Sequence, residues 1–161
     1  MHIATSSTTT LFPHFFATMA DAQLYEETFQ CTTLITETYD RVHRVLGTSH
    51  DNTTSITLDI NSELYPIGTQ DSFSMLIAST LNLDGTKEEA ATGWRPRNNE
   101  ASLADMWDYV CYGKVYKVED PEDGDRIKVY VSFGGLLLCL DGPYKKLSPL
   151  KIEYVYMLLK K

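Results

Sequence analysis

The stretch YVSFGGLLLCLDG, residues 130–142, places two adjacent glycines inside a run of large apolar residues that otherwise has the pattern of a β-strand. Glycine in a strand interior weakens the strand, because it packs no side chain and loses more backbone freedom on folding. Gly134 and Gly135 therefore need a geometric reason. They can form a tight connection between two strands, a bend at a barrel corner, or a close approach of the backbone to a ligand phosphate.

Alternation of apolar and polar residues continues on both sides of the glycines and predicts a strand on each side. The alternating apolar residues are Ile127, Val129, Val131 and Phe133 before the glycines, and Leu136, Leu138 and Leu140 after them. Leu137 and Cys139 lie on the opposite face of the second strand. That strand is apolar on both faces, and such a strand is expected to be covered on both.

Other segments show the same two-residue period or are rich in β-branched and aromatic residues, and we predict strands there too. They are residues 27–39, 40–49, 55–67, 72–80, 109–120 and 153–161. The residues expected to share one apolar face are Ile56, Leu58, Ile60 and Leu64 in the first alternating segment, and Val110, Tyr112, Tyr116 and Val118 in a later one.

Two short helical turns interrupt the strands. Ser102 and Asp105 have the spacing of a capping box, and Ser148-Pro149 places a proline at the first position of a helix. The polar connection over residues 82–105 is longer than most loops of compact domains, and such loops are usually functional or mobile.

About eight antiparallel strands joined mostly by short connections define an all-β domain, either a closed barrel or a sandwich. In both architectures Gly134 and Gly135 form a tight turn or a corner bend. The phosphate interpretation is weaker, because no helix follows the glycines to receive an anion.

Composition limits the classes of function. The chain has 161 residues and a net charge of −8, which argues against a protein that binds nucleic acid unaided. One domain of this length can bury a core without disulfides, and no apolar run is long enough to span a membrane. Residues 1–18 contain no Lys, Arg, Asp or Glu, which predicts a disordered extension, upstream of the true start, ahead of a single domain over residues 19–161.

The acidic stretch DPEDGD, residues 120–125, has some features of a calcium loop. With Gly124 at the sixth position of such a loop, the third is Pro121 and the twelfth is Tyr130, and neither supplies a carboxylate. A solvated turn explains this stretch better.

No set of residues indicates catalysis. The three cysteines are far apart and suggest buried thiols rather than a disulfide or a zinc site. A cysteine nucleophile requires a nearby histidine, and nothing in the sequence brings His43 or His50 to Cys111 or Cys139. We therefore expect no enzyme activity, no metal and no cofactor.

Tyrosines and basic residues cluster in neighbouring predicted strands. The tyrosines are Tyr109, Tyr112, Tyr116 and Tyr130, and the basic residues are Lys114, Lys117, Arg126 and Lys128. Tyrosines on an exposed strand face can stack nucleic-acid bases, so single-strand binding is an alternative to a barrel core with ordinary outward lysines.

Several motifs, in order along the chain, resemble one family. They are ITLDIN and ELYP within residues 56–66, IASTLNLDGT (77–86), YVCYGKVYK (109–117), YVSFGGLLLCLDG (130–142) and YMLLKK (156–161). From about Leu24 to its end, the chain is similar to the eighth subunit shared by the eukaryotic nuclear RNA polymerases I, II and III.

This resemblance implies an eight-stranded antiparallel Greek-key barrel related to the OB-fold, with a long mobile loop at residues 82–105. It implies a non-catalytic subunit of the nucleus, including the nucleolus, that has no cofactor and supports assembly and stability of the transcription enzyme. Family members bind the largest polymerase subunit, away from the active centre and near the pore side. Other polymerase subunits are further expected partners, whereas membrane contact and more than weak nucleic-acid binding are not. The alternative remains an OB-fold protein that binds single-stranded nucleic acid.

The expected contact surface is an apolar, aromatic part of the barrel wall. Its candidate residues are Trp94, Arg95, Pro96, Tyr112, Gly134, Gly135 and Leu137. At Cys139 the family commonly carries a basic residue, so a contact made there by relatives is expected to be altered in this chain. Residues 1–18 have no counterpart in the family.

Overall fold

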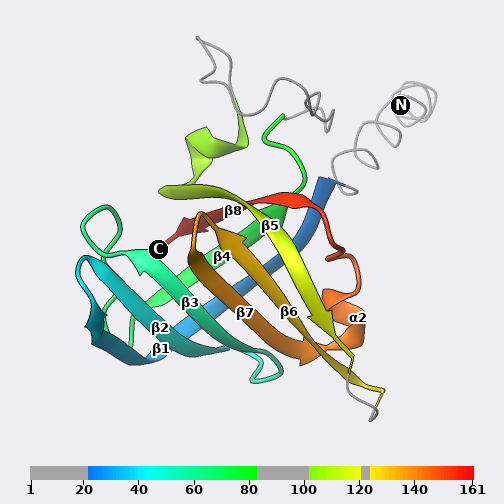
Figure 1. The fold of residues 1–161 in the computed structure, drawn as a ribbon, viewed down its shortest axis with the longest axis horizontal. Coiled ribbons are helices and arrows are strands. Elements are labelled where there is room, and N and C mark those ends of the chain that lie inside the picture. Colours follow the sequence, from blue (N-terminus) through cyan, green and yellow to red (C-terminus); the bar gives the residue numbers. More distant parts are fainter. Residues whose placement is uncertain (1–21, 83–101, 121–123) are drawn as a thin grey trace, which may run out of the picture.

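The computed structural model describes residues 22–82, 102–120 and 124–161, which form a closed barrel of antiparallel strands (Figure 1). The strands are β1 (Gln23–Tyr39), β2 (Val42–Ser49), β3 (Ser55–Asn61), β4 (Ser72–Ala78), β5 (Tyr109–Glu119), β6 (Arg126–Phe133), β7 (Leu136–Pro143) and β8 (Tyr154–Lys160). The short helical segments are η1 (Leu103–Met106) and α2 (Tyr144–Leu147). No helix in the described residues is long and apolar enough to cross a membrane. The prediction of an all-β, eight-stranded antiparallel barrel is confirmed.

Strand order around the barrel is β1-β2-β3-β7-β6-β5-β8-β4. Three consecutive strands followed by a fourth that returns beside the first define a Greek key. The order β4-β1-β2-β3 satisfies this definition, and so does β8-β5-β6-β7. The barrel is therefore two Greek-key halves, a first half of β1–β4 and a second half of β5–β8, joined where β3 pairs with β7 and β4 with β8.

The two halves match residue by residue. Gln30 of β1 pairs with the first residue of β4, and Lys114 of β5 pairs with the first residue of β8. The next amide of each long strand donates to the residue ahead of that partner strand: Cys31 N–H to the Asp71 carbonyl (2.8 Å), and Val115 N–H to the Glu153 carbonyl (3.0 Å).

Each long strand then has an irregularity, between Cys31 and Thr33 and between Val115 and Lys117. Beyond it, each long strand continues beside only one neighbour, β1 beside β2 and β5 beside β6. The pairs Thr57–Cys139 and Leu76–Leu158 each join equivalent residues of the two halves. The halves are thus related by an approximate two-fold axis through these two pairs.

Inward-facing side chains fill the barrel. Equivalent residues of the two halves are buried together, as with Leu58 and Leu140, which are both fully buried. The alternating apolar residues before Gly134 face this core, as do Leu138 and Leu140 after it, while Leu136 is partly buried against it. Gly134 and Gly135 form the two-residue turn between Phe133 and Leu136, with φ of 64° and 100°. Positive φ at both positions suits the right-handed twist of a hairpin, which explains the glycine pair.

A second, smaller apolar cluster lies outside the barrel, over β4 and β8. Its buried members are Leu76, Ala78, Leu81, Leu103, Tyr156 and Leu158. The turn η1 closes over this cluster, and the predicted capping box is present: Ser102 Oγ accepts from Ala104 N–H (3.2 Å), and Asp105 Oδ2 accepts from Ser102 N–H (2.9 Å). The chain itself therefore covers the outer face at β4 and β8.

Three expectations about local structure are wrong. Leu64 does not share the buried face of β3, because the strand ends at Asn61 and Leu64 lies 74% exposed in the following turn. Asp59 alternates with Leu58 and Ile60, which predicts a place on the polar, solvated face of the strand, but it is buried. Ser148-Pro149 does not begin a helix, because α2 precedes it and Ser148 is its C-cap.

The expected apolar face of β5 also needs correction. Val110 and Tyr112 face outward, and Tyr116 lies in the irregularity that shifts the alternation, so Val118 pairs with inward-facing Val129. A continuous two-residue period does not survive this extra residue. The predicted extension 1–18 and residues 83–101 of the long loop lie outside the described residues, and the domain boundary at residue 19 stays a prediction.

Candidate partner-binding surface

Large side chains gather on the outer wall of the second half, where Figure 1 shows β5, β6 and β7 side by side. We call this surface the tyrosine face and define it by Tyr112, Lys114, Tyr116, Tyr130, Leu137 and Tyr154. Tyr112 is 43% exposed, Leu137 39% and Tyr154 57%. Exposed apolar and aromatic groups placed together mark interaction surfaces far more often than scattered ones do.

Tyr112 and Tyr154 form the part of the face that lies on β5 and β8. Their rings stack almost parallel, 5.5 Å apart with an interplanar angle of 6°. The Tyr112 ring also contacts the buried Tyr156 ring, with 4.8 Å between the ring centroids. The ammonium of Lys114 lies over the Tyr154 ring, 5.3 Å from its centroid. These contacts fix the two exposed rings before any partner arrives, which lowers the entropy cost of binding.

Tyr116 and Tyr130 continue the face along β5 and β6, with ring centroids 6.1 Å apart. Lys117 lies over the Tyr130 ring and pairs with Glu119 at 2.7 Å. Desolvation, with the neighbouring Cys139 and Glu119, raises the pKa of the Tyr130 phenol to about 12. Tyr130 therefore stays a neutral hydrogen-bond donor, here to Glu119 Oε2 at 3.3 Å.

One cross-strand row links the tyrosines to Leu137. Lys114 pairs with Tyr154 on one side and with Ser132 on the other, and Ser132 pairs with Leu137. Directly paired residues of neighbouring strands point to the same side of a sheet. Tyr154, Lys114, Ser132 and Leu137 therefore share the outer wall.

Beyond Leu137, the row ends at an ion pair. Arg44 binds Asp59 through two bonds, Nε to Oδ1 (2.7 Å) and Nη2 to Oδ2 (3.1 Å), and Asp59 Oδ2 also accepts the Leu137 N–H (3.1 Å). These bonds explain why a carboxylate is buried on β3.

Five of the six equivalent positions of the first half carry polar residues. The equivalents of Tyr112, Lys114, Tyr116, Leu137 and Tyr154 are Thr28, Gln30, Thr32, Ser55 and Ser72, and the equivalent of Tyr130 is the half-buried Leu46. Thr28 bonds Ser74 through their hydroxyls (3.2 Å), and Gln30 bonds Gln70 (3.2 Å). The same wall is thus solvated in one half and aromatic in the other, so barrel construction does not require the tyrosines.

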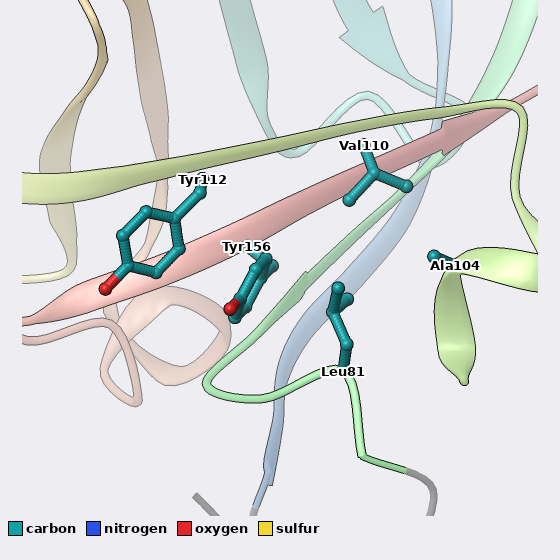
Figure 2. Close-up of a pocket in the computed structure, with 5 residues that line it drawn as sticks. All are labelled: Leu81, Ala104, Val110, Tyr112 and Tyr156. Atoms are coloured by element: carbon teal, nitrogen blue, oxygen red, sulfur yellow. The ribbon is translucent and has the colours of Figure 1, made fainter. Parts of the chain in front are cut away.

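A shallow pocket of about 220 Å³ adjoins the tyrosine face (Figure 2). Its lining is Leu81, Ala104, Val110, Tyr112 and Tyr156. In Figure 2 both tyrosine hydroxyls point away from Val110 and Ala104, which leaves aliphatic groups at one end of the pocket and phenols at the other.

The structure places the candidate residues as follows. Tyr112 and Leu137 share the outer wall of the second half, and Gly134 and Gly135 are exposed at the β6–β7 turn beside Leu137. Trp94, Arg95 and Pro96 lie outside the described residues. Tyr109 does not belong with the other tyrosines, because it is buried in the core and its hydroxyl accepts the Asn61 N–H at 3.3 Å.

Sequence reasoning missed Tyr154. The signal was present, since Tyr154, Tyr156 and Leu158 alternate on one face of β8. What was lacking was the pairing of β8 with β5, which brings Tyr154 against Tyr112.

Nucleophile and metal chemistry find no support in the described residues. Burial raises the pKa values of the Cys31, Cys111 and Cys139 thiols, which disfavours the thiolate that a nucleophile needs. Within residues 22–82, 102–120 and 124–161, no group of three or more His, Cys, Asp or Glu side chains could hold a metal ion. The surface instead defines a barrel domain that presents one aromatic wall.

Comparison with known proteins identifies the family of this barrel. The family model described as RNA polymerase Rpb8 matches residues 26–161. The chain is 38% identical over 143 residues to "DNA-directed RNA polymerases I, II, and III subunit RPABC3" of Schizosaccharomyces pombe, covering 89% of this chain and all of that protein. It is 42% identical over 144 residues to the Saccharomyces cerevisiae protein of the same name, covering 86% and 97%. A relative from Arabidopsis thaliana, "DNA-directed RNA polymerases II, IV and V subunit 8B", is 37% identical over 126 residues, covering 76% and 84%. The chain belongs to the RNA polymerase Rpb8 family.

Proposed function

We propose that this chain is a non-catalytic common subunit of the nuclear RNA polymerases I, II and III. It binds the largest subunit, supports assembly and stability of the transcription enzyme, and works in the nucleus, including the nucleolus. Family membership and the names of the relatives support the assignment to the three polymerases. The barrel serves as a rigid scaffold for protein contact and has no active site of its own.

The main support for this contact surface is that the two halves differ in their outward side chains. Equivalent outward positions hold Tyr112, Leu137 and Tyr154 in the second half and Thr or Ser in the first. Exposed aromatic side chains held in fixed positions are typical anchors of protein interfaces. The largest subunit therefore covers the tyrosine face, with Gly134 and Gly135 at its border and Trp94, Arg95 and Pro96 as further contacts.

Single-strand nucleic-acid binding is the second candidate, since tyrosines and lysines share this wall. The charge of −8 opposes it, because a phosphate chain needs several free cations along its path. Lys117 is already paired with Glu119. Binding by the isolated chain is weak or absent near physiological salt.

Affinity purification of the tagged chain from nuclear extract, with nuclease and moderate salt, tests the proposal. Mass spectrometry of the bound fraction is expected to recover the large subunits of all three polymerases in near-equal proportion to the bait. Recovery of none of them with a folded bait would overturn the assignment.

A further inference from the structure

Lys114 occupies the centre of the tyrosine face, and none of the described salt bridges includes it. It lies between Tyr154 and Ser132 in the cross-strand row, and its ammonium contacts the Tyr154 ring. Among the described residues, no Asp or Glu lies within salt-bridge distance of Lys114. By contrast, the equivalent wall of the first half has the neutral Gln30, which bonds Gln70.

Apolar groups flank this cation on both sides. The stacked rings of Tyr112 and Tyr154 lie at one end of the row, and Leu137 lies at the other. When a partner covers such a wall, water leaves the ammonium, and a carboxylate becomes its best replacement ligand. A partner without one would leave a desolvated cation in the interface, which is costly.

We propose that Lys114 receives one carboxylate of the partner, flanked by two apolar side chains that pack on the Tyr112–Tyr154 pair and on Leu137. This inference rests on the proposed function and names the chemistry of the partner segment. Tyr154 and Leu137 are separated by three strand spacings of about 4.8 Å, so the two apolar side chains lie about 14 Å apart. A segment of about five extended residues, with apolar residues at its ends and Asp or Glu between them, spans that distance.

A protein carboxylate fits this wall better than a nucleic acid. A phosphate chain needs a series of free cations. Lys117 is held by Glu119, and Arg126 by Asp141. Lys128 of β6 lies between these same two acidic residues, paired with Glu119 of β5 and with Asp141 of β7. The faces of Tyr112 and Tyr154 are also turned toward each other, which leaves less open ring surface for bases to stack on. The Lys114 ammonium, placed between apolar groups, therefore matches one carboxylate.

The test uses the tagged full chain co-expressed with the full-length largest subunit, captured and washed over a salt series. Lys114→Glu is expected to lower recovery of the largest subunit at least about tenfold, because it places like charges together in a desolvated interface. Lys114→Gln is expected to lower recovery less and to flatten its salt dependence, and Lys114→Arg to retain it. Gln30→Glu, at the equivalent position of the first half, is the matched control and is expected to leave recovery unchanged. Thermal melting of each free variant shows that it is folded.

Two further outcomes separate this inference from the proposed function. If Leu137→Ser loses the largest subunit while Lys114→Glu retains it, the carboxylate inference is wrong and the contact surface stands. If both variants bind like wild type, both proposals about this surface are wrong. Loss of binding to a labelled single-stranded oligonucleotide in Lys114→Gln, with recovery of the largest subunit unchanged, would overturn the inference in favour of a nucleic-acid site.

Discussion

The two Greek-key halves of this barrel have matching pairing and differ in what they present outward. Inward, the equivalent residues are often identical: Val45 and Val129, Leu58 and Leu140, Met75 and Met157. Outward, the first half has Thr or Ser at positions where the second half has Tyr or Leu. Barrel closure constrains the inner set in both halves, because their side chains fill one close-packed core. The outer set is free to serve a partner, and the tyrosine face lies on the second half.

The largest expected effect tests the shared interior. Leu58→Ala and Leu140→Ala each remove a fully buried side chain, and each is expected to lower the free energy of unfolding by about 2–5 kcal/mol. Urea unfolding measures both values. A loss from one of these substitutions several times that from the other would contradict the equivalence of the two halves inside the shared core.

The next prediction tests the outer difference. Leu137→Ser gives the second half the residue that the first half has at its equivalent, Ser55, and is expected to weaken binding of the largest subunit by about 2 kcal/mol. Serine is preferred to aspartate because Asp59 already accepts the Leu137 amide, so a second carboxylate there would repel it. Capture of the co-expressed largest subunit measures the effect.

Ser55→Ala is the control for this substitution, since it changes the equivalent position of the first half. It is expected to leave capture of the largest subunit unchanged. Equal losses from Ser55→Ala and Leu137→Ser would place the contact surface on both halves.

A smaller effect on stability is expected in the connections between the last two strands of each half, β7–β8 in the second half and β3–β4 in the first. Lys146 of α2 bonds Asp51, Glu27 (3.1 Å) and Thr53 (3.1 Å), and its hydrogen bond is the main cause of the lowered Asp51 pKa. A carboxyl group whose pKa is lowered in the folded state stabilises the fold above its unfolded pKa of about 3.9 and loses that contribution as the pH falls through its folded value. Lys146→Met is therefore expected to lower the melting temperature at neutral pH, with the difference shrinking in acid.

Lys161 is the comparison, because it pairs with Asp71 in the connection of the first half at 3.4 Å. The Asp71 pKa is lowered mainly by the Gly68 N–H, so Lys161→Met is expected to change the melting temperature less. Melting curves over a pH series measure both variants. A Lys146→Met deficit that persists unchanged in acid would contradict the role of Asp51.

The smallest effects concern the turns of the two hairpins. Gly135 has a φ of 100° in the tight β6–β7 turn, where Ala is strained, and Gly135→Ala is expected to cost about 1 kcal/mol of unfolding free energy. Asn52 has a φ of 60° in the longer β2–β3 turn, a conformation that Asn tolerates, so Asn52→Gly is expected to change stability by only about a few tenths of a kcal/mol. Urea unfolding of both variants checks the difference.

Much of the fold could be predicted from the sequence because the two-residue period is strong in β3, β4, β6 and β7. The face of β5 could not, because one extra residue at Tyr116 shifts the alternation without any local signal. The internal two-fold relation also escaped detection. It resides in inward residues spread over four strands, whereas the outward residues between them differ in kind.

The contact surface could be predicted only in part. Leu137 was identifiable from a strand that is apolar on both faces, and Tyr112 from the tyrosines that cluster in neighbouring strands, but their shared wall depends on β5, β6 and β7 being neighbours. Tyr154 lies beside Tyr112 because β5 pairs with β8, and these are the first and last strands of the second half. No local pattern encodes that pairing, because it arises where β8 returns beside β5 to complete the second Greek key.

Hydroxyl-radical footprinting of the free chain and of the chain bound to the largest subunit tests the central claim most directly. It reads the oxidation of exposed Tyr and Leu side chains by mass spectrometry, without any substitution. Tyr112, Leu137 and Tyr154 of the second half are expected to lose reactivity on binding. Tyr39 and Leu64 of the first half, which are 61% and 74% exposed, are expected to keep theirs. Protection of Tyr39 and Leu64, with Tyr112, Leu137 and Tyr154 still reactive, would contradict the claim that the aromatic wall of the second half is the partner-binding surface.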